Sequence, residues 1–280
     1  MKDIRTGYIE LNLNDEELAE YFSGMYQFPE MPENHYGIVK NNGETQAKFC
    51  YQKGQIKQIR YPTISTQKGS ITPRNDYQAC AIDLLLSRDV PVKLLTGRGG
   101  AGKDLLMANA AMQLLERGKF RKIVYIRPNV TVADVPDIGF LKGDTFSKLE
   151  WTLGPLFDKY GDKDNLNRLV KNGTVELVPL IHIRGRSFEN SIVYVSEGQN
   201  LTDQLMELLI TRIGEGSELW INGDVEQIDR RVYKENNGIQ TMQKVLTGRP
   251  EFGQVYLPII ERSNVAKLGE LFKHGMDIQD

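Results

Sequence analysis

Alternating polar and apolar positions at the start of the chain predict β-structure. Residues 7–13, GYIELNL, alternate in the manner of a half-buried strand, and Asn14 with Glu17 has the spacing of a capping box that opens the short helix DEELAEYF. The further runs GIVK, TQAKFCYQ and QIKQIRY are separated by the turn signals NNGE and KG, which predicts a small meander. We therefore expect a small β-rich N-terminal domain over residues 1–70. The segment 62–75, PTISTQKGSITPRN, has no period and is interpreted as a linker.

From residue 76 onward, apolar runs of strand length alternate with helical stretches. The strand-like runs are VKLLT, KIVYIR, VELVPL, SIVYVS, ELWING and QVYLPI, and stretches such as DLLMANAAMQLLERG and TDQLMELLITRIG lie between them. This alternation predicts βαβ units on a parallel sheet. Ligands on such sheets bind beyond the carboxyl ends of the strands. We therefore expect an α/β domain over residues 71–280 with its functional site at that edge.

One glycine-rich loop stands directly after a strand and directly before a helix. Gly97, followed by four residues and then Gly102-Lys103, has the spacing of a phosphate-binding loop. The strand–loop–helix order aims backbone N–H groups and a helix N-terminus at one anion. The nucleotide-binding residues expected from this loop are Gly97, Arg98, Gly99, Gly100, Ala101, Gly102, Lys103, Asp104 and Leu105. A glycine-rich turn that only caps a helix is the alternative interpretation.

Two positions of this expected site depart from the usual pattern. The loop ends in Asp104, where the motif has Ser or Thr, and the strand SIVYV ends in Ser196-Glu197, where P-loop ATPases have Asp-Glu. The departures are complementary, because a swap keeps one carboxylate and one hydroxyl, and Mg²⁺ needs oxygen ligands from either segment. We therefore expect Asp104 and Ser196 to hold Mg²⁺. Independent decay of both positions is the alternative, and it predicts arbitrary residues at each.

Composition narrows the class of protein. The 280 residues are 40% hydrophobic and 26% charged, with no run of about 18 apolar residues, so no membrane partner is expected. No secretion signal is evident, and Cys50 and Cys80 have no CxxC spacing, which suits the cytoplasm. The net charge of -2 means that the chain lacks the overall positive charge typical of nucleic-acid-binding proteins. Any nucleic-acid binding would therefore need a local basic groove.

Several motifs in order resemble one known family. From PRNDYQACAIDLLL through the loop, RPNV, GFLKGD, RGRSFENSIVYVSEGQN, TRIGEGS, NGDVEQID and ERSNVAKL, residues 71–272 are similar to the PhoH-like P-loop ATPases, relatives of superfamily 1 helicases. The resemblance implies a RecA-like core, ATP and Mg²⁺ as cofactors, RNA or single-stranded DNA as partner, and a homo-oligomer such as a hexameric ring. It does not extend to the PIN nuclease domain of longer members, so ribonuclease activity is not expected. Family members have Thr and Asp where this chain has Asp104 and Ser196. This difference is expected to affect the hydrolysis of ATP more than its binding.

The resemblance also implies roles for single residues around the loop. Gln78 matches a glutamine that reads the adenine edge, with an exposed helix residue as the alternative. Glu197 would be the general base or the group that positions water, with a solvent-facing carboxylate at a strand end as the alternative. Lys103 is also expected among the catalytic residues. Asp224 and Gln227 would sense the γ-phosphate or merely form an Asx turn. Arg262 would neutralise charge on the γ-phosphate, and a surface salt bridge would explain it nearly as well.

Other polar and aromatic residues have weaker implied roles. Arg127, Arg184 and Arg186 follow strands and could contact nucleic-acid phosphates, or they are simply solvated loop residues. The histidines and tryptophans are expected to be structural or core residues: His182, His274, Trp151 and Trp220.

The sequence predicts a Mg²⁺-dependent ATPase of PhoH type that acts on RNA or single-stranded DNA in a helicase-like manner. A pseudo-ATPase that binds ATP as a switch without cleaving it is the first alternative. A small-molecule kinase is the second, since kinases use the same loop, although SEGQN and GDVEQID fit water activation and phosphate sensing better.

Overall fold

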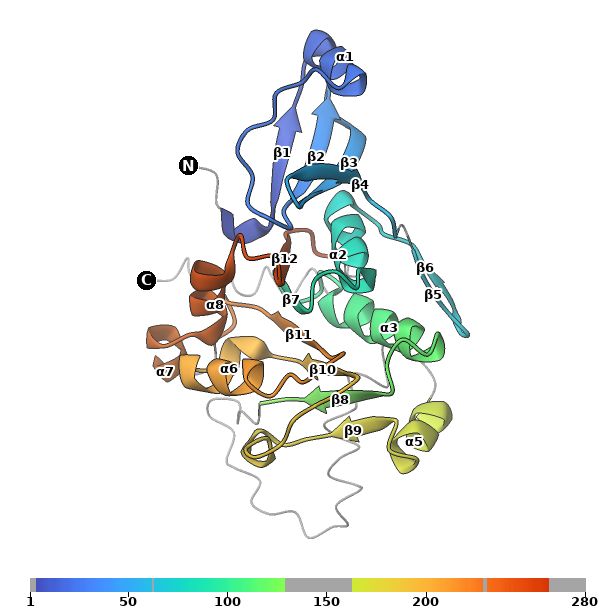
Figure 1. Ribbon diagram of the computed structural model, residues 1–280, viewed down its shortest axis with the longest axis vertical. Coiled ribbons are helices and arrows are strands. Elements are labelled where there is room, and N and C mark those ends of the chain that lie inside the picture. Colours follow the sequence, from blue (N-terminus) through green and yellow to red (C-terminus); the bar gives the residue numbers. More distant parts are fainter. Residues whose placement is uncertain (1–3, 62, 129–162, 229–230, 262–280) are drawn as a thin grey trace, which may run out of the picture.

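The structure is a computed structural model that describes residues 4–61, 63–128, 163–228 and 231–261. Two sheets lie one above the other along its long axis (Figure 1). The smaller, N-terminal sheet has the order β1-β2-β3-β4, in which β1 is parallel to β2 and the remaining strands form the expected antiparallel meander. The strands are β1 (Tyr8–Asn12), β2 (Tyr36–Asn41), β3 (Glu44–Gln52) and β4 (Gln55–Gln58), preceded by the 3-10 turn η1 (Ile4–Thr6).

Helix α1 (Asp15–Ser23) connects β1 to β2, and it begins with the expected capping box. The Asn14 side chain accepts from the Glu17 backbone N–H, and the Glu17 carboxylate accepts from the Asn14 backbone N–H, both at 2.9 Å. Gly24 ends the helix in the left-handed conformation. The predicted position and N-terminal cap of this helix are therefore confirmed.

The segment interpreted as a linker contains a hairpin. Strands β5 (Ile64–Thr66) and β6 (Gly69–Ile71) pair antiparallel and pack on helix α3. The backbone N–H of Ser65 donates to the Gln113 side chain, that of Gln67 donates to Glu116 at 2.9 Å, and Ile64 is fully buried. The prediction of a linker without regular structure is therefore wrong for this stretch. Short strands of this kind are stabilised by tertiary packing that a local pattern does not carry.

The larger sheet consists of six parallel strands in the order β12-β7-β11-β10-β8-β9. They are β7 (Val92–Gly97), β8 (Lys122–Ile126), β9 (Val175–Leu177), β10 (Ser191–Val195), β11 (Glu218–Gly223) and β12 (Phe252–Leu257), so all six predicted strands are confirmed. This is the order of a RecA-like P-loop core, and it places β11 between the loop strand β7 and β10. Side chains at the carboxyl ends of these three strands are therefore neighbours.

Helices cover both faces of the larger sheet, and each face has its own apolar core. Helices α2 (Asp76–Leu86), α3 (Lys103–Glu116) and α5 (Lys163–Lys171) pack on one face, where Trp220 is fully buried as a core residue. Helices α6 (Asp203–Ile210) and α8 (Gly238–Leu246) pack on the other. The remaining short elements are η2 (Leu180–His182), η3 (Gly198–Asn200) and α7 (Arg231–Glu235). Within the described ranges, no helix has the length and apolarity needed to cross a membrane.

The N-terminal sheet is fastened to the far end of the chain. The Asn34 amide nitrogen lies 3.2 Å from the carbonyl oxygen of Arg249 and 2.9 Å from those of Pro250 and Phe252, at the turn that leads into β12. Asn34 is buried and has a left-handed backbone, with φ of 61°. The two hydrogens of this amide are shared among three carbonyl oxygens, so Asn34 links the segment before β2 to the start of β12.

Candidate functional site

The glycine-rich loop adopts a conformation that only glycine tolerates. Gly97, Gly100 and Gly102 have φ of 140°, 91° and 96°, and a Cβ on Gly97 would lie 2.4 Å from the carbonyl oxygen of Leu257 on β12. Gly102 is the N-cap of α3, so the loop passes directly from the end of β7 into the first turn of that helix. Strand, loop and helix N-terminus are therefore arranged as the sequence predicted for an anion site.

Lys103 lies folded across the loop that precedes it. Its Nζ donates to the carbonyl oxygen of Gly97 at 2.5 Å and to that of Arg98 at 3.0 Å, and the residue is 8% exposed. The Gly99 backbone N–H donates to Asp224 Oδ2 at 2.9 Å, which ties the loop to the end of β11. Both the cation and the loop backbone are thus held at the carboxyl edge of the sheet.

Three neutral donors converge on one oxygen of Asp104, in the first turn of α3. Tyr194 Oη lies 3.0 Å, Ser196 Oγ 3.3 Å and Asn222 Nδ2 2.8 Å from Asp104 Oδ1. In the part of the chain that the structure describes, no group donates to Oδ2, and Asp104 lines the cleft beside the loop. The two residues that depart from the usual motif are therefore in contact, with the carboxylate on the loop and the hydroxyl on the neighbouring strand.

Two tyrosines in edge-to-face contact, Tyr125 and Tyr194, adjoin Ser196 and Asp104. The rings of Tyr125 and Tyr194 meet edge to face at 5.2 Å, and Tyr125 hydrogen bonds to Ser196. Burial, with a smaller effect of the Asp104 charge, raises the pKa of Tyr125 to about 12 and that of Tyr194 well above its usual range. Both phenols therefore stay protonated, and Tyr194 remains a donor to the carboxylate.

Glu197 follows Ser196 in a strained backbone conformation. Its φ of 58° lies in the left-handed region, and its backbone N–H donates to Asn222 Oδ1 at 3.2 Å. Its carboxylate accepts from Gln199 Nε2 at 2.7 Å and lies 3.8 Å from Arg127 Nη2. The side chain is 40% exposed and lines the cleft, so a carboxylate is presented there with a fixed orientation.

The turn after β11 forms the Asx turn expected as one alternative for Asp224, and it also contacts the glycine loop. Its Oδ1 accepts from the Glu226 backbone N–H at 3.1 Å, which forms the Asx turn, while Oδ2 accepts from the loop as described above. The buried Gln199 accepts from the Asp224 backbone N–H at 3.1 Å. Gln227 is exposed and lines the cleft. Gln199 therefore connects the carboxylate of Glu197 to this turn.

Gln78 is buried and joins α2 to the glycine loop. Its Oε1 accepts from the Arg74 backbone N–H at 2.9 Å, and its Nε2 donates to the carbonyl oxygen of Ala101 at 3.1 Å. It still lines the cleft. An adenine edge could use the second amide hydrogen without breaking either bond.

A cleft of about 640 Å³ brings these groups together. Its lining includes Arg74, Gln78, Lys103, Asp104, Glu197 and Glu261. The Glu261 backbone N–H donates to the carbonyl oxygen of Gly100 at 3.1 Å, so the chain after β12 rests on the loop. The volume lies in the range typical of small-molecule sites, and the mixture of donors, two cationic side chains and carboxylates suits a phosphate ester with its metal ion.

The arginines predicted to contact nucleic acid have different environments. Arg127 faces Glu197 at the site, and Arg184 is exposed beside α6. Arg186 is paired with Glu176 at 2.7 Å and lies over the Phe188 ring, so much of its charge is already neutralised. His182 lies exposed in η2. Arg262, Trp151 and His274 lie outside the described residues.

Four residues of the site were not expected from the sequence: Tyr194, Gln199, Asn222 and Glu261. Both Tyr194 and Asn222 lie within runs that the sequence predicts as strands, SIVYVS and ELWING, and neither position carries a signal of its own. The strand order was the missing information, because only β11 lying between β7 and β10 places Asn222 between Asp104 and Glu197.

The family is decided by comparison with known proteins. Residues 70–268 match the family described as PhoH-like protein. The chain belongs to this family. Protein PhoH2 of Mycolicibacterium smegmatis is 34% identical over 94% of this chain and 61% of its own length, and Protein PhoH2 of Bacillus subtilis is 37% identical over 71% and 46%. Protein PhoH of Escherichia coli K12 is 30% identical over 68% and 54%.

The PhoH-like chain therefore spans about half to three fifths of these relatives. Among solved structures, the Pif1 helicase from Candida albicans aligns with 73% of the chain at 15% identity and a TM-score of 0.39, which is too low to support a functional conclusion. Family membership confirms the resemblance and the class of P-loop NTPase, which binds nucleotides. Hydrolysis, the metal ion and the nucleic acid are separate questions.

Proposed function

We propose that this PhoH-like protein is a Mg²⁺-dependent ATPase that acts on RNA or single-stranded DNA, with Asp104 and Ser196 as the residues that hold the metal ion. The contact between these two side chains at the carboxyl edge of the sheet carries the proposal, because it pairs a carboxylate with a hydroxyl beside the phosphate-binding loop. Mg²⁺ bound there would neutralise phosphate charge.

The remaining groups of the cleft fit the same reaction. The loop N–H groups and Lys103 would bind the phosphates, and Lys103 would exchange the carbonyls of Gly97 and Arg98 for phosphate oxygens. Glu197 would orient and deprotonate the attacking water, since a carboxylate that accepts one amide hydrogen bond and faces Arg127 at 3.8 Å has further acceptor positions. Asp224 and Gln227 would sense the γ-phosphate, and Arg262 would stabilise charge there from its own subunit or from a neighbour in an oligomer.

The nucleic-acid part of the proposal rests on family resemblance and on two arginines. Arg127 lies at the carboxyl end of β8 beside the cleft, and Arg184 is exposed. If Arg127 or Arg184 contacts the phosphate backbone of a nucleic acid, that contact would explain how a bound RNA or DNA strand affects the nucleotide site. Arg186 is a weaker candidate, because Glu176 already pairs with it.

The test measures nucleotide binding and phosphate release separately. A fluorescent ATP analogue is titrated with Mg²⁺ and with a chelator, and phosphate release is followed at low salt with RNA, single-stranded DNA, duplex DNA or no nucleic acid. We expect Mg²⁺-dependent binding and release that a single strand stimulates, both lost in Lys103→Met. Binding without release would instead identify a nucleotide-dependent switch, and absence of binding would overturn the proposal.

A further inference from the structure

Helix α2 lies between the N-terminal sheet and the glycine loop, and it is bonded to both. The sheet lies above α2 and the loop strand β7 beside it (Figure 1). The helix carries Gln78 in its first turn, so its position sets part of the cleft wall. What holds its first turn in place is therefore relevant to the nucleotide site.

The N-terminal sheet grips the first residue of α2. Thr45 Oγ1 donates to Asp76 Oδ2 at 2.5 Å, and Lys48 Nζ lies 2.9 Å from Asp76 Oδ1, both from strand β3. Burial raises the pKa of the Asp76 carboxyl, but the bonds to Thr45 and Lys48 outweigh it and hold this pKa below its usual value. The carboxylate is therefore charged and engaged at both oxygens.

A second bond comes from strand β1. The Tyr77 hydroxyl donates to the Glu10 carboxylate, which Lys40 of β2 also binds at 2.8 Å, and the rings of Tyr77 and Tyr8 lie 4.9 Å apart. Residues of strands β1, β2 and β3 thus all contribute to the contacts that position Asp76 and Tyr77 of α2.

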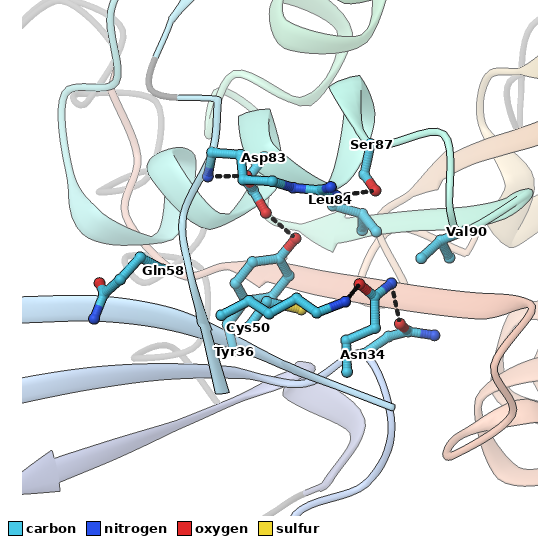
Figure 2. A pocket seen from close by; sticks show the side chains of 11 residues that line it. Asn34, Tyr36, Cys50, Gln58, Asp83, Leu84, Ser87 and Val90 are labelled. Atoms are coloured by element: carbon cyan, nitrogen blue, oxygen red, sulfur yellow. Dashed lines mark hydrogen bonds between the residues drawn. The ribbon is translucent and has the colours of Figure 1, made fainter. Parts of the chain in front are cut away.

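The third contact is buried further along the helix. Asp83 accepts from Tyr36 Oη of β2 at 3.0 Å and from the backbone N–H groups of Arg60 at 2.8 Å and Tyr61 at 3.1 Å. Figure 2 shows Tyr36 pointing at Asp83 beside a cavity of about 10 Å³, enough for about one water molecule. The helix is therefore bonded to the N-terminal part of the chain at two points along its length, its first turn and Asp83.

On its opposite side, the start of α2 is bonded to the cleft. Asn75, the N-cap, donates to Glu261 Oε1 at 2.8 Å, and Gln78 bridges Arg74 and Ala101 as described above. The cleft wall also includes residues 70–72 and Arg74, which lead into the helix. Asp76 is two residues from Gln78, so a shift of the first turn would move the amide directly.

We propose that the N-terminal sheet is a positioning element of the nucleotide site, and that it acts through Asp76. Asp76 is a positioning residue, since it lies outside the cleft lining and acts on ligand through the start of α2. Binding geometry is sensitive to displacements of about 1 Å. The wall formed by Arg74 and Gln78 serves the nucleoside part of the ligand, whereas the loop and Lys103 serve the phosphates. The inference rests on the proposed function of the cleft as an ATP site.

The test removes the contacts between the N-terminal sheet and Asp76 and leaves the residues that line the cleft unchanged. The double variant Thr45→Val with Lys48→Met removes both partners of Asp76. We expect an ATP analogue to bind about tenfold more weakly, the equivalent of one net hydrogen bond, while inorganic tripolyphosphate binds unchanged. A change in base selectivity should accompany the loss, with the ratio of ATP to GTP affinity falling towards one.

The chain offers a matched control ion pair. Lys122–Glu176 has a length of 2.8 Å and exposures of 30% and 32%, against 2.9 Å and 30% and 26% for Lys48–Asp76, and it lies on β8 and β9. Lys122→Met removes one positive charge, as Lys48→Met does, but at a site away from α2. It should change neither the affinity for the ATP analogue nor that for tripolyphosphate. Tyr77→Phe, which removes only the hydroxyl, should act in the same direction as the double variant but more weakly.

Each outcome has a distinct meaning. Unchanged ATP affinity in a folded double variant would overturn the inference and leave the proposed function intact. An equal loss for ATP analogue and tripolyphosphate would also overturn it, because the sheet would then act only on general stability, as unfolding curves would show. Wild-type protein that binds tripolyphosphate but no nucleotide would overturn the proposed function, and the inference with it.

Discussion

The hydroxyl of Ser196 donates to the carboxylate of Asp104 at 3.3 Å, so the two residues that distinguish this chain from the usual P-loop pattern share one hydrogen bond. In the usual pattern, the loop would supply the hydroxyl and the strand the carboxylate. Because the carboxylate and the hydroxyl have exchanged places here, we expect the effects of substitutions at Asp104 and Ser196 to depend strongly on each other. Asp104→Thr leaves the metal without a carboxylate, and Ser196→Asp sets two carboxylates side by side.

We expect each single variant to lose about a hundredfold in phosphate release, and the double variant to recover most of that loss. The measurement is the steady-state rate at fixed Mg²⁺ for wild type, both singles and the double. Losses that simply add would show that the positions do not share a metal ion, and would favour independent decay.

The charge of Asp104 should make nucleotide affinity depend on Mg²⁺. A carboxylate about 4 Å from a phosphate charge is repelled by roughly 4 kcal/mol at an effective dielectric near 20 unless a cation lies between them. Asp104→Asn removes this repulsion, so chelation of Mg²⁺ should weaken binding of an ATP analogue about tenfold less than in wild type. Glu226→Gln, which removes an exposed carboxylate paired with Arg98, is the control and should leave the Mg²⁺ dependence unchanged.

Asn222 should matter more than its place at a strand end suggests. Asn222→Leu removes the donor to Asp104 and the acceptor of the Glu197 N–H, so we expect about 1–3 kcal/mol lower stability and at least tenfold slower phosphate release. Asn222→Asp keeps the acceptor for Glu197 but turns a second carboxylate towards Asp104. Urea unfolding and initial rates measure both effects. Wild-type rates in Asn222→Leu would contradict a positioning role.

Gly97→Ala should damage the loop without removing any polar group. The new methyl carbon would lie 2.4 Å from the Leu257 carbonyl oxygen, so β7 and β12 must separate or the loop must shift. We expect a loss of about 2 kcal/mol in the free energy of unfolding and weaker nucleotide binding. Gly43→Ala is the control, because Gly43 has φ of 83° but no atom within 4 Å. Gly43→Ala should lower the free energy of unfolding only by the cost of backbone strain. An equal loss in Gly97→Ala and Gly43→Ala would contradict the steric explanation.

Asp83 should contribute a pH-dependent term to stability. Burial raises its pKa above the usual 3.8, although its bonds to Arg60, Tyr61 and Tyr36 oppose this. The folded protein then binds the proton more tightly than the unfolded chain, so this term stabilises the fold as pH falls through the raised pKa and is lost as pH rises. Denaturation curves of wild type and Asp83→Asn between about pH 4 and 7 should converge towards acid. Parallel curves would contradict a raised pKa.

Much of the fold could be predicted from the sequence, because β-branched runs, capping residues and glycine spacing act locally. All six strands of the large sheet and the Asn14 capping box were found in this way. The pairing of Asp104 with Ser196 also followed, since the loop that leads to Asp104 and the residue Ser196 both follow parallel strands at the same edge of the sheet.

Features that depend on distant partners could not be predicted. The β5–β6 hairpin was interpreted as linker because Gln113 and Glu116, which bind its backbone, lie on α3. Likewise, nothing near Asp76 in the sequence points to Thr45 and Lys48 as its partners. These contacts join separate sheets and helices, and their residues are too common in type to signal a pairing.

The three carbonyls around Asn34 have a consequence for synthesis of the chain. They lie 215 to 218 residues downstream of it. At about 5–20 residues per second, the ribosome delivers them roughly ten to forty seconds after Asn34 has been made. During that interval the Asn34 amide of the nascent N-terminal sheet lacks these acceptors, and synthesis of β12, the last strand in the described part of the chain, supplies them.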